Sequence, residues 1–185
     1  MTDGSGGGVI SVLGEDHRWL EGIVRDYERG AFGERGPRDL VAHLITELVR
    51  HAVADERYVY PLVQEVLPDG AKLADQEMQR LAGAERTMKA LEGIDSDAAD
   101  FDRLTRELFA DIREHVFWEG RDVLPRLEDH CTPEQIQDAG DKVRRAKENA
   151  PTHPHPVVAD ARPATSVLDP GVGLIDKVRD ALGGG

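Results

Sequence analysis

Four long stretches of the chain place apolar residues three or four positions apart, which is the spacing of one face of an α-helix. These stretches cover residues 9–29, 37–66, 71–92 and 98–129, and short breaks rich in Gly, Pro and Asp, such as "LPDG", separate them. The strict alternation of apolar and polar residues that predicts a β-strand is absent from the sequence. The pattern therefore predicts an all-α fold, an up-down-up-down four-helix bundle.

The sequence after these stretches predicts a short helix and then a tail. "CTPEQ" begins a short fifth helix, with Thr132 as its N-cap and Pro133 in its first turn. The run "APTHPHPVVADARPATSVLDPG" is too rich in proline for a regular element, and a short amphipathic helix over 172–182 follows it. We therefore divide the chain into a bundle domain at 9–148 and an extended, Pro-rich tail with a short helix at 149–185.

Charge and composition exclude several classes of function. The net charge of −13 argues against binding to nucleic acid or to an anionic lipid surface. No apolar run reaches the length that spans a bilayer, and "MTDGSGGGVI" lacks the basic region and apolar core of a secretory signal. A single cysteine excludes an intrachain disulfide framework. We expect a cytoplasmic protein that binds neither nucleic acid nor membranes.

The second and fourth stretches repeat one pattern of ionisable residues. It reads "HAVADERYVYP" from His51 and "HVFWEGRDVLP" from His115. In both copies a carboxylate, Asp55 or Glu119, follows the histidine by four residues. Residues four apart share one face of a helix, so each pair presents one nitrogen ligand and one oxygen ligand in the same direction.

Each copy of the pattern ends on a proline, Pro61 or Pro125. Proline has no backbone N–H and interrupts the hydrogen-bond ladder of an α-helix. We therefore expect each helix to be kinked or loosened just beyond its polar pair.

The apolar faces of the first and third stretches also carry ionisable residues. His17 lies on the first, and Glu85 lies among Met78, Leu81 and Met88 on the third. Burying such groups unpaired costs several kcal/mol each, whereas a whole domain is stabilised by only about 5–15 kcal/mol. The groups must therefore neutralise one another, or a metal must neutralise them. Imidazoles and carboxylates that converge from four helices are the ligand set of di-iron and di-manganese bundles. The ligand types alone leave iron, manganese and zinc open.

With these motifs the sequence resembles hemerythrin-like proteins with the HHE cation-binding domain, in the form common among high-GC Gram-positive bacteria. The segments "EDH", "RHAVADERYVYP", "AERTMKALEGID" and "REHVFWEGRDVLPRL" carry the resemblance, which covers nearly the whole chain. It implies a four-helix bundle that holds two iron ions with an oxo or hydroxo bridge. The small ligands that it implies are O2, peroxide and nitric oxide.

The resemblance also implies a ligand set, position by position. His17, His51 and His115 would supply nitrogen, and Asp55 and Glu119 would be the bridging carboxylates.

The chain departs from the family pattern at two positions. Glu85 matches the acid of a His-x-x-x-Glu pair on the third helix, but Leu81 stands where the histidine of that pair should be. One iron therefore loses a nitrogen ligand, and a single-ion site becomes an alternative. Asp55 is shorter than the usual glutamate, so Glu56 is an alternative to it. Tyr58, one turn further along, is a candidate phenolate ligand.

Three functions follow from this interpretation. The first is a redox-type di-iron protein that binds O2 or consumes peroxide or nitric oxide, with no catalytic residue beyond the metal ligands. The second is a metal- or O2-responsive sensor whose helix at 172–182 contacts a protein partner. The third is a structural bundle with a degenerate or partial metal site, because Leu81 replaces a ligand.

Overall fold

The computed structural model describes residues 7–34, 36–95, 97–150 and 153. All regular structure in these residues is helical and no strand occurs in them, which confirms the predicted all-α fold. No helix in this part of the chain is both long enough and apolar enough to cross a membrane. The elements are α1 (Val9–Glu28), α2 (Gly36–Ala54), η1 (Asp55–Val59), α3 (Tyr60–Val66), α4 (Gly70–Glu92), α5 (Ala99–Trp118), η2 (Glu119–Val123), α6 (Leu124–His130) and α7 (Pro133–Asn149).

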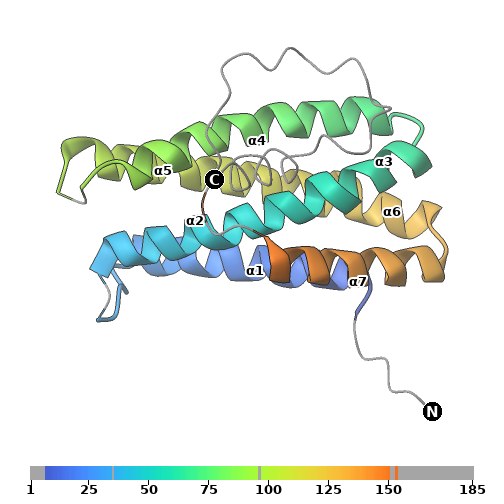
Figure 1. Cartoon of the computed structure of the whole chain (residues 1–185), viewed down its shortest axis with the longest axis horizontal. Helices are drawn as coiled ribbons and strands as arrows, with labels where there is room; N and C mark the ends of the chain where they lie inside the picture. Colours follow the sequence, from blue (N-terminus) through green and yellow to red (C-terminus); the bar gives the residue numbers. More distant parts are fainter. Residues whose placement is uncertain (1–6, 35, 96, 151–152, 154–185) are drawn as a thin grey trace, which may run out of the picture.

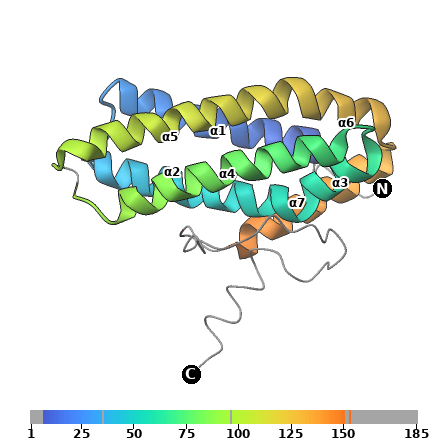
Figure 2. The same ribbon diagram turned by 90° about the horizontal axis from the view of Figure 1, so that it is seen from above.

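Four antiparallel helical rods form the bundle, and α7 lies against it (Figures 1 and 2). The rods are α1, the continuous run from α2 through η1 to α3, α4, and the continuous run from α5 through η2 to α6. The helix α7 packs along α1 and α2. The up-down-up-down bundle with a short fifth helix is therefore as predicted, whereas the predicted tail helix at 172–182 lies outside the described residues.

Two π-helical turns, Asp55–Val59 and Glu119–Val123, interrupt the two long rods. Each turn begins at the carboxylate of the repeated sequence pattern and ends just before an α-helix whose first turn contains Pro61 or Pro125. In a π turn the carbonyl oxygen accepts from the N–H five residues ahead, so the turn is wider than an α turn. Proline cannot continue the α-helical ladder, which explains why a loosened turn precedes each proline.

The bundle interior has two apolar clusters with a polar layer between them. Leu13 and Leu127 belong to the cluster at the end formed by α3 and α6. Leu20 and Ile112 belong to the cluster at the other end. His17 lies between Leu13 and Leu20 on α1 and is only 6% exposed. The two clusters therefore flank the polar layer on both sides.

The position of α7 depends on a cap and a close helix approach. Thr132 and Gln135 form a reciprocal capping box at its start, as expected for the predicted N-cap. A side chain at Gly140 would place its Cβ 2.7 Å from the backbone of Gly8, so glycine allows α7 to lie directly against the start of α1. This packing brings Lys147, near the end of α7, alongside α1.

The helix α4 buries a different face from the one that the sequence predicted. Met78, predicted in the apolar stripe, is 39% exposed, so that part of the prediction is wrong. Glu77, Ala84 and Met88 are buried instead, and Glu85 is half-buried. The stripe was misassigned because a carboxylate such as Glu77 is expected in solvent unless a partner compensates its burial.

The apolar cluster next to His17 can be tested through Leu13, which is fully buried. We expect Leu13→Ala to destabilise the protein by about 2–5 kcal/mol, because it removes apolar contacts and leaves a cavity. Arg18→Ala on the exposed face of α1 is the control, and should change the unfolding free energy by less than about 0.5 kcal/mol. Denaturant unfolding measures both values, and equal effects would contradict the assigned core.

Candidate metal centre

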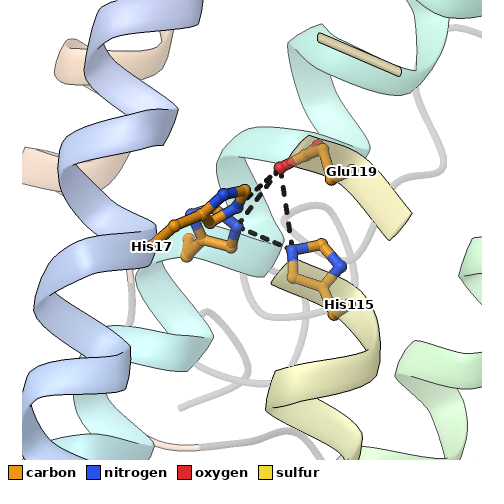
Figure 3. A group of neighbouring side chains, drawn as sticks. His17, His115 and Glu119 are labelled. Atoms are coloured by element: carbon orange, nitrogen blue, oxygen red, sulfur yellow. Dashed lines mark hydrogen bonds and ion pairs between the residues drawn. The ribbon is translucent and has the colours of Figure 1, made fainter. Parts of the chain in front are cut away.

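Five ionisable side chains meet in the polar layer between the two apolar clusters. His17 comes from α1, His51 from the end of α2, and Asp55 from the first position of η1. His115 comes from the end of α5 and Glu119 from the first position of η2. Asp55 and Glu119 are completely buried. Figure 3 shows His17, His115 and Glu119 pointing toward a common centre.

The nitrogen and oxygen atoms of these side chains are closely spaced. His51 Nε2 lies 2.8 Å from His115 Nε2 and 3.1 Å from Asp55 Oδ2. His17 Nε2 lies 2.9 Å from Glu119 Oε2. One ligand atom from each of the three histidines and Glu119 lies within 4.8 Å of the others. Metal–ligand bonds of about 2.0–2.2 Å require neighbouring donors at about this separation.

Two further carboxylates determine which nitrogen of each ring carries a hydrogen. His51 Nδ1 lies 3.3 Å from Asp16 Oδ2, and His115 Nδ1 lies 3.1 Å from Glu77 Oε1. Since an ionised carboxylate only accepts hydrogen bonds, each Nδ1 carries the hydrogen and each Nε2 presents a lone pair. The two Nε2 atoms therefore face each other at 2.8 Å, which requires a proton or a metal ion to bind between them or beside them.

Several buried polar atoms of the layer have no hydrogen-bond partner among the described residues. They are both carboxylate oxygens of Asp55, both of Glu119, and Nε2 of His17. The close approach of His17 to Glu119 lacks hydrogen-bond geometry, so it leaves both groups unsatisfied. Buried carboxylates without partners are costly, and a bound cation removes that cost. The donor set therefore fits a metal ion.

Each of the two carboxylates that hold a ring is itself paired with a cation. Asp16 pairs with Lys147 of α7, and Glu77 Oε2 lies 3.1 Å from Arg80 Nη1. Burial opposes ionisation of Asp16, but His51 and Lys147 together lower its pKa. Such carboxylate–histidine pairs fix the ring orientation and raise the basicity of the free nitrogen.

The pKa shifts describe the protein without metal. Burial lowers the pKa of His51 to about 4, so this ring is neutral at neutral pH. Burial and the charge of Glu119 raise the pKa of Asp55 well above its usual value. Burial lowers the pKa of His115, but Glu77 and Glu119 outweigh this effect and raise it. Binding of a metal would therefore displace protons from Asp55 and His115.

Three residues predicted as ligands lie outside the convergent group. Among the described residues, no hydrogen bond or ion pair joins Glu56, Tyr58 or Glu85 to the five side chains of the polar layer. Burial and the charge of Glu85 raise the pKa of Glu56 to about 7. Tyr58 packs against the apolar cluster near α3, under the guanidinium of Arg57.

Sequence reasoning missed the residues that support the histidines. Asp16 directly precedes His17 in "EDH", and Glu77 lies one helical turn before Leu81. Their places beside predicted site positions could have indicated that both lie near the site. Nothing in the sequence indicated that Lys147 lies near the site, because the packing of α7 on α1 decides its position. The π turn brings Tyr60, rather than Tyr58, into the lining of a cavity that also contacts Asp55.

The model of the hemerythrin HHE cation-binding domain family matches residues 6–127, which is more than half of the chain. The chain belongs to this family. The protein is also similar to an uncharacterized hemerythrin-like protein of Schizosaccharomyces pombe, with 26% identity over 175 residues, 94% of this chain and 86% of the relative. No solved structure matches. The resemblance predicted from the sequence is thus confirmed, and the polar layer of this hemerythrin-like chain fits a metal-binding bundle.

The support of His115 can be tested with Glu77→Gln. This change keeps the shape of the side chain but removes the charge that raises the basicity of the ring. We expect metal affinity to fall by about 10- to 100-fold, as for other residues that orient metal-binding histidines. Glu114→Gln is the matched control, because Glu114 also pairs with Arg80, but among the described residues no ion pair joins its carboxylate to a histidine of the site. Competition with a chelator measures both affinities; equal values would contradict this role of Glu77.

Metal affinity should increase with pH. The raised pKa values of Asp55 and His115 mean that both groups hold protons that a metal must displace, and raising the pH removes this competition. The affinity for Zn²⁺ should therefore rise between about pH 6 and pH 8, by up to about tenfold per pH unit for each proton displaced. Zn²⁺ titration in a weakly buffered solution would also detect the released protons. An affinity independent of pH, with no proton release, would contradict the assignment.

Proposed function

We propose that this hemerythrin-like protein holds a non-haem iron centre that binds or reacts with O2, peroxide or nitric oxide. The observation that carries the proposal is the 2.8 Å separation between Nε2 of His51 and Nε2 of His115. Asp16 and Glu77 occupy the opposite nitrogens of both rings, so the two lone pairs converge in a buried layer. A metal ion satisfies them together with the unpartnered carboxylate oxygens nearby.

The proposed ligands are the nitrogens of His17, His51 and His115 and the oxygens of Asp55 and Glu119. Imidazole and carboxylate together are common ligands of iron in proteins. We propose two ions bridged by the carboxylates, as in the family pattern, with one held less tightly because position 81 offers no nitrogen. A single ion is the alternative, and the short distance between His51 and His115 favours it, since one ion could bind both rings.

The bound iron would supply a Lewis-acidic, redox-active centre for a small ligand. The chain supports this chemistry by holding His51 neutral and by fixing the rings of His51 and His115 through Asp16 and Glu77. The apolar clusters on both sides give the layer surroundings of low polarity, which suit small neutral ligands.

Two other functions make different predictions. A sensor or interaction module would act through the segment at 172–182, which lies outside the described residues. A degenerate structural bundle would have the same polar layer but no use for a metal, and Leu81 is the residue that favours it. The response of an iron-loaded protein to small ligands separates both functions from the proposed one.

The test is to load the protein with Fe(II) without air and to record its visible and near-ultraviolet spectrum before and after adding O2, peroxide or nitric oxide. The wild-type protein should bind iron and change its spectrum with at least one of the three. His115→Ala should lose most of the bound iron and the response, because it removes a central nitrogen. His130→Ala is the matched control, since His130 is exposed and its ring contacts the carbonyl oxygen of Arg126. A wild-type protein that binds iron but responds to none of the three would contradict the proposal.

A further inference from the structure

We infer that a cavity between α2, α4 and α5 binds a small, neutral, apolar organic molecule beside the metal site. The inference extends the proposed function, because the molecule would lie next to the proposed ligands. Occupation of the cavity can nevertheless be measured whether or not the metal proposal holds.

The cavity has a volume of about 230 Å³, and its lining includes residues of the polar layer. These residues are His51, Asp55 and His115, so three of the five convergent side chains contact the space. The body of the cavity is apolar, and its walls come from all three helices: Leu48, Ala52, Leu81, Ala84 and Ile112. A molecule in the cavity would therefore contact both apolar side chains and residues of the metal site.

The size of the cavity selects a molecule larger than a diatomic gas. An apolar cavity of about 150 Å³ inside a protein is large enough to bind benzene. A cavity of about 230 Å³ accommodates a substituted ring or a short branched hydrocarbon. Leu81 contributes to the apolar wall of this cavity on α4, because its side chain has no donor atom that could bind a metal.

The charges around the cavity exclude anions. Glu77, Asp111 and Glu114 all line it and are acidic. Two of its described lining residues can carry positive charge at neutral pH, and carboxylates engage both. Arg80 lies 3.1 Å from Glu77 and 3.2 Å from Glu114. His115 Nδ1 lies 3.1 Å from Glu77 Oε1. These two carboxylates already engage both groups, and the carboxylates of Asp55 and Glu119 would offset the charge of a bound metal, so no uncompensated cation attracts an anionic ligand. The matching ligand is therefore neutral.

The test compares two probes of similar size, toluene and benzoate, on the full-length protein whose metal content has been measured. Toluene should bind and raise the midpoint of thermal unfolding, whereas benzoate should give no shift at the same concentration. Ligand-detected NMR would measure the two affinities. Absence of toluene binding, or equal binding of benzoate, would overturn the inference.

Matched variants locate the bound probe. Ala84→Leu fills the cavity from a buried position of α4, and Ala90→Leu makes the same change on the exposed face of that helix. We expect Ala84→Leu to weaken toluene binding by about tenfold or more, because the probe loses its apolar contact area, and Ala90→Leu to leave it unchanged. Equal affinities in the two variants would place the probe elsewhere and overturn the inference.

Leu81→Ala provides a second variant in case Ala84→Leu fails to fold. It enlarges the cavity from a half-buried position, so the protein should gain affinity for the larger neutral probe naphthalene relative to toluene. An unchanged ratio of the two affinities would overturn the inference.

The metal content separates this inference from the proposed function. A protein that holds iron but does not bind toluene would disprove the cavity ligand and leave the proposed function standing. A protein that binds toluene in the cavity but takes up no iron would support the cavity ligand and disprove the proposed function.

Discussion

The structure depends on the need to neutralise a buried layer of imidazoles and carboxylates. His51 and His115 face each other through nitrogens 2.8 Å apart, and the carboxylates of Asp55 and Glu119 lie beside them without hydrogen-bond partners among the described residues. A bundle of this size could not retain such groups without compensation, because a few unpaired burials equal the stability of a domain. A cation at the centre of the layer removes this conflict, and the two apolar clusters then stabilise the bundle from both sides.

The repeated sequence pattern now has a structural explanation. In both copies the histidine lies in the last turn of an α-helix, the carboxylate begins a π turn, and the proline follows in the next helix. The spacing of four residues places the carboxylate beside the histidine of its own rod, and the wide turn that follows lets the chain continue past a proline. Each ring is then fixed by a carboxylate that a cation holds in turn, Lys147 through Asp16 for one and Arg80 through Glu77 for the other. Because Lys147 belongs to α7, the fifth helix takes part in the support of the site.

Much of this arrangement could be predicted from the sequence, and the rest depends on packing between helices. Apolar spacing predicted the rods, and the interruption of the stripes by His17, His51 and His115 predicted a shared polar layer. The phase of α4 was misjudged at Met78, because the burial of Glu77 depends on partners that lie on α4 and α5. The inward position of Tyr60 depends on a π turn, which changes the helical phase after Asp55 and leaves no signal in hydrophobic periodicity. The contact of Lys147 with Asp16 depends on how α7 docks, which local sequence does not determine.

The central claim is that a metal ion completes the polar layer. The most direct measurement is therefore the metal content of the purified protein, followed by its thermal unfolding with and without a strong chelator. The account predicts at least one tightly bound iron per chain and a clear fall in the unfolding midpoint when the metal is removed, because the charges of the layer are then uncompensated. A protein that is purified without metal, takes up none when iron is added, and unfolds at the same temperature in chelator would contradict the account.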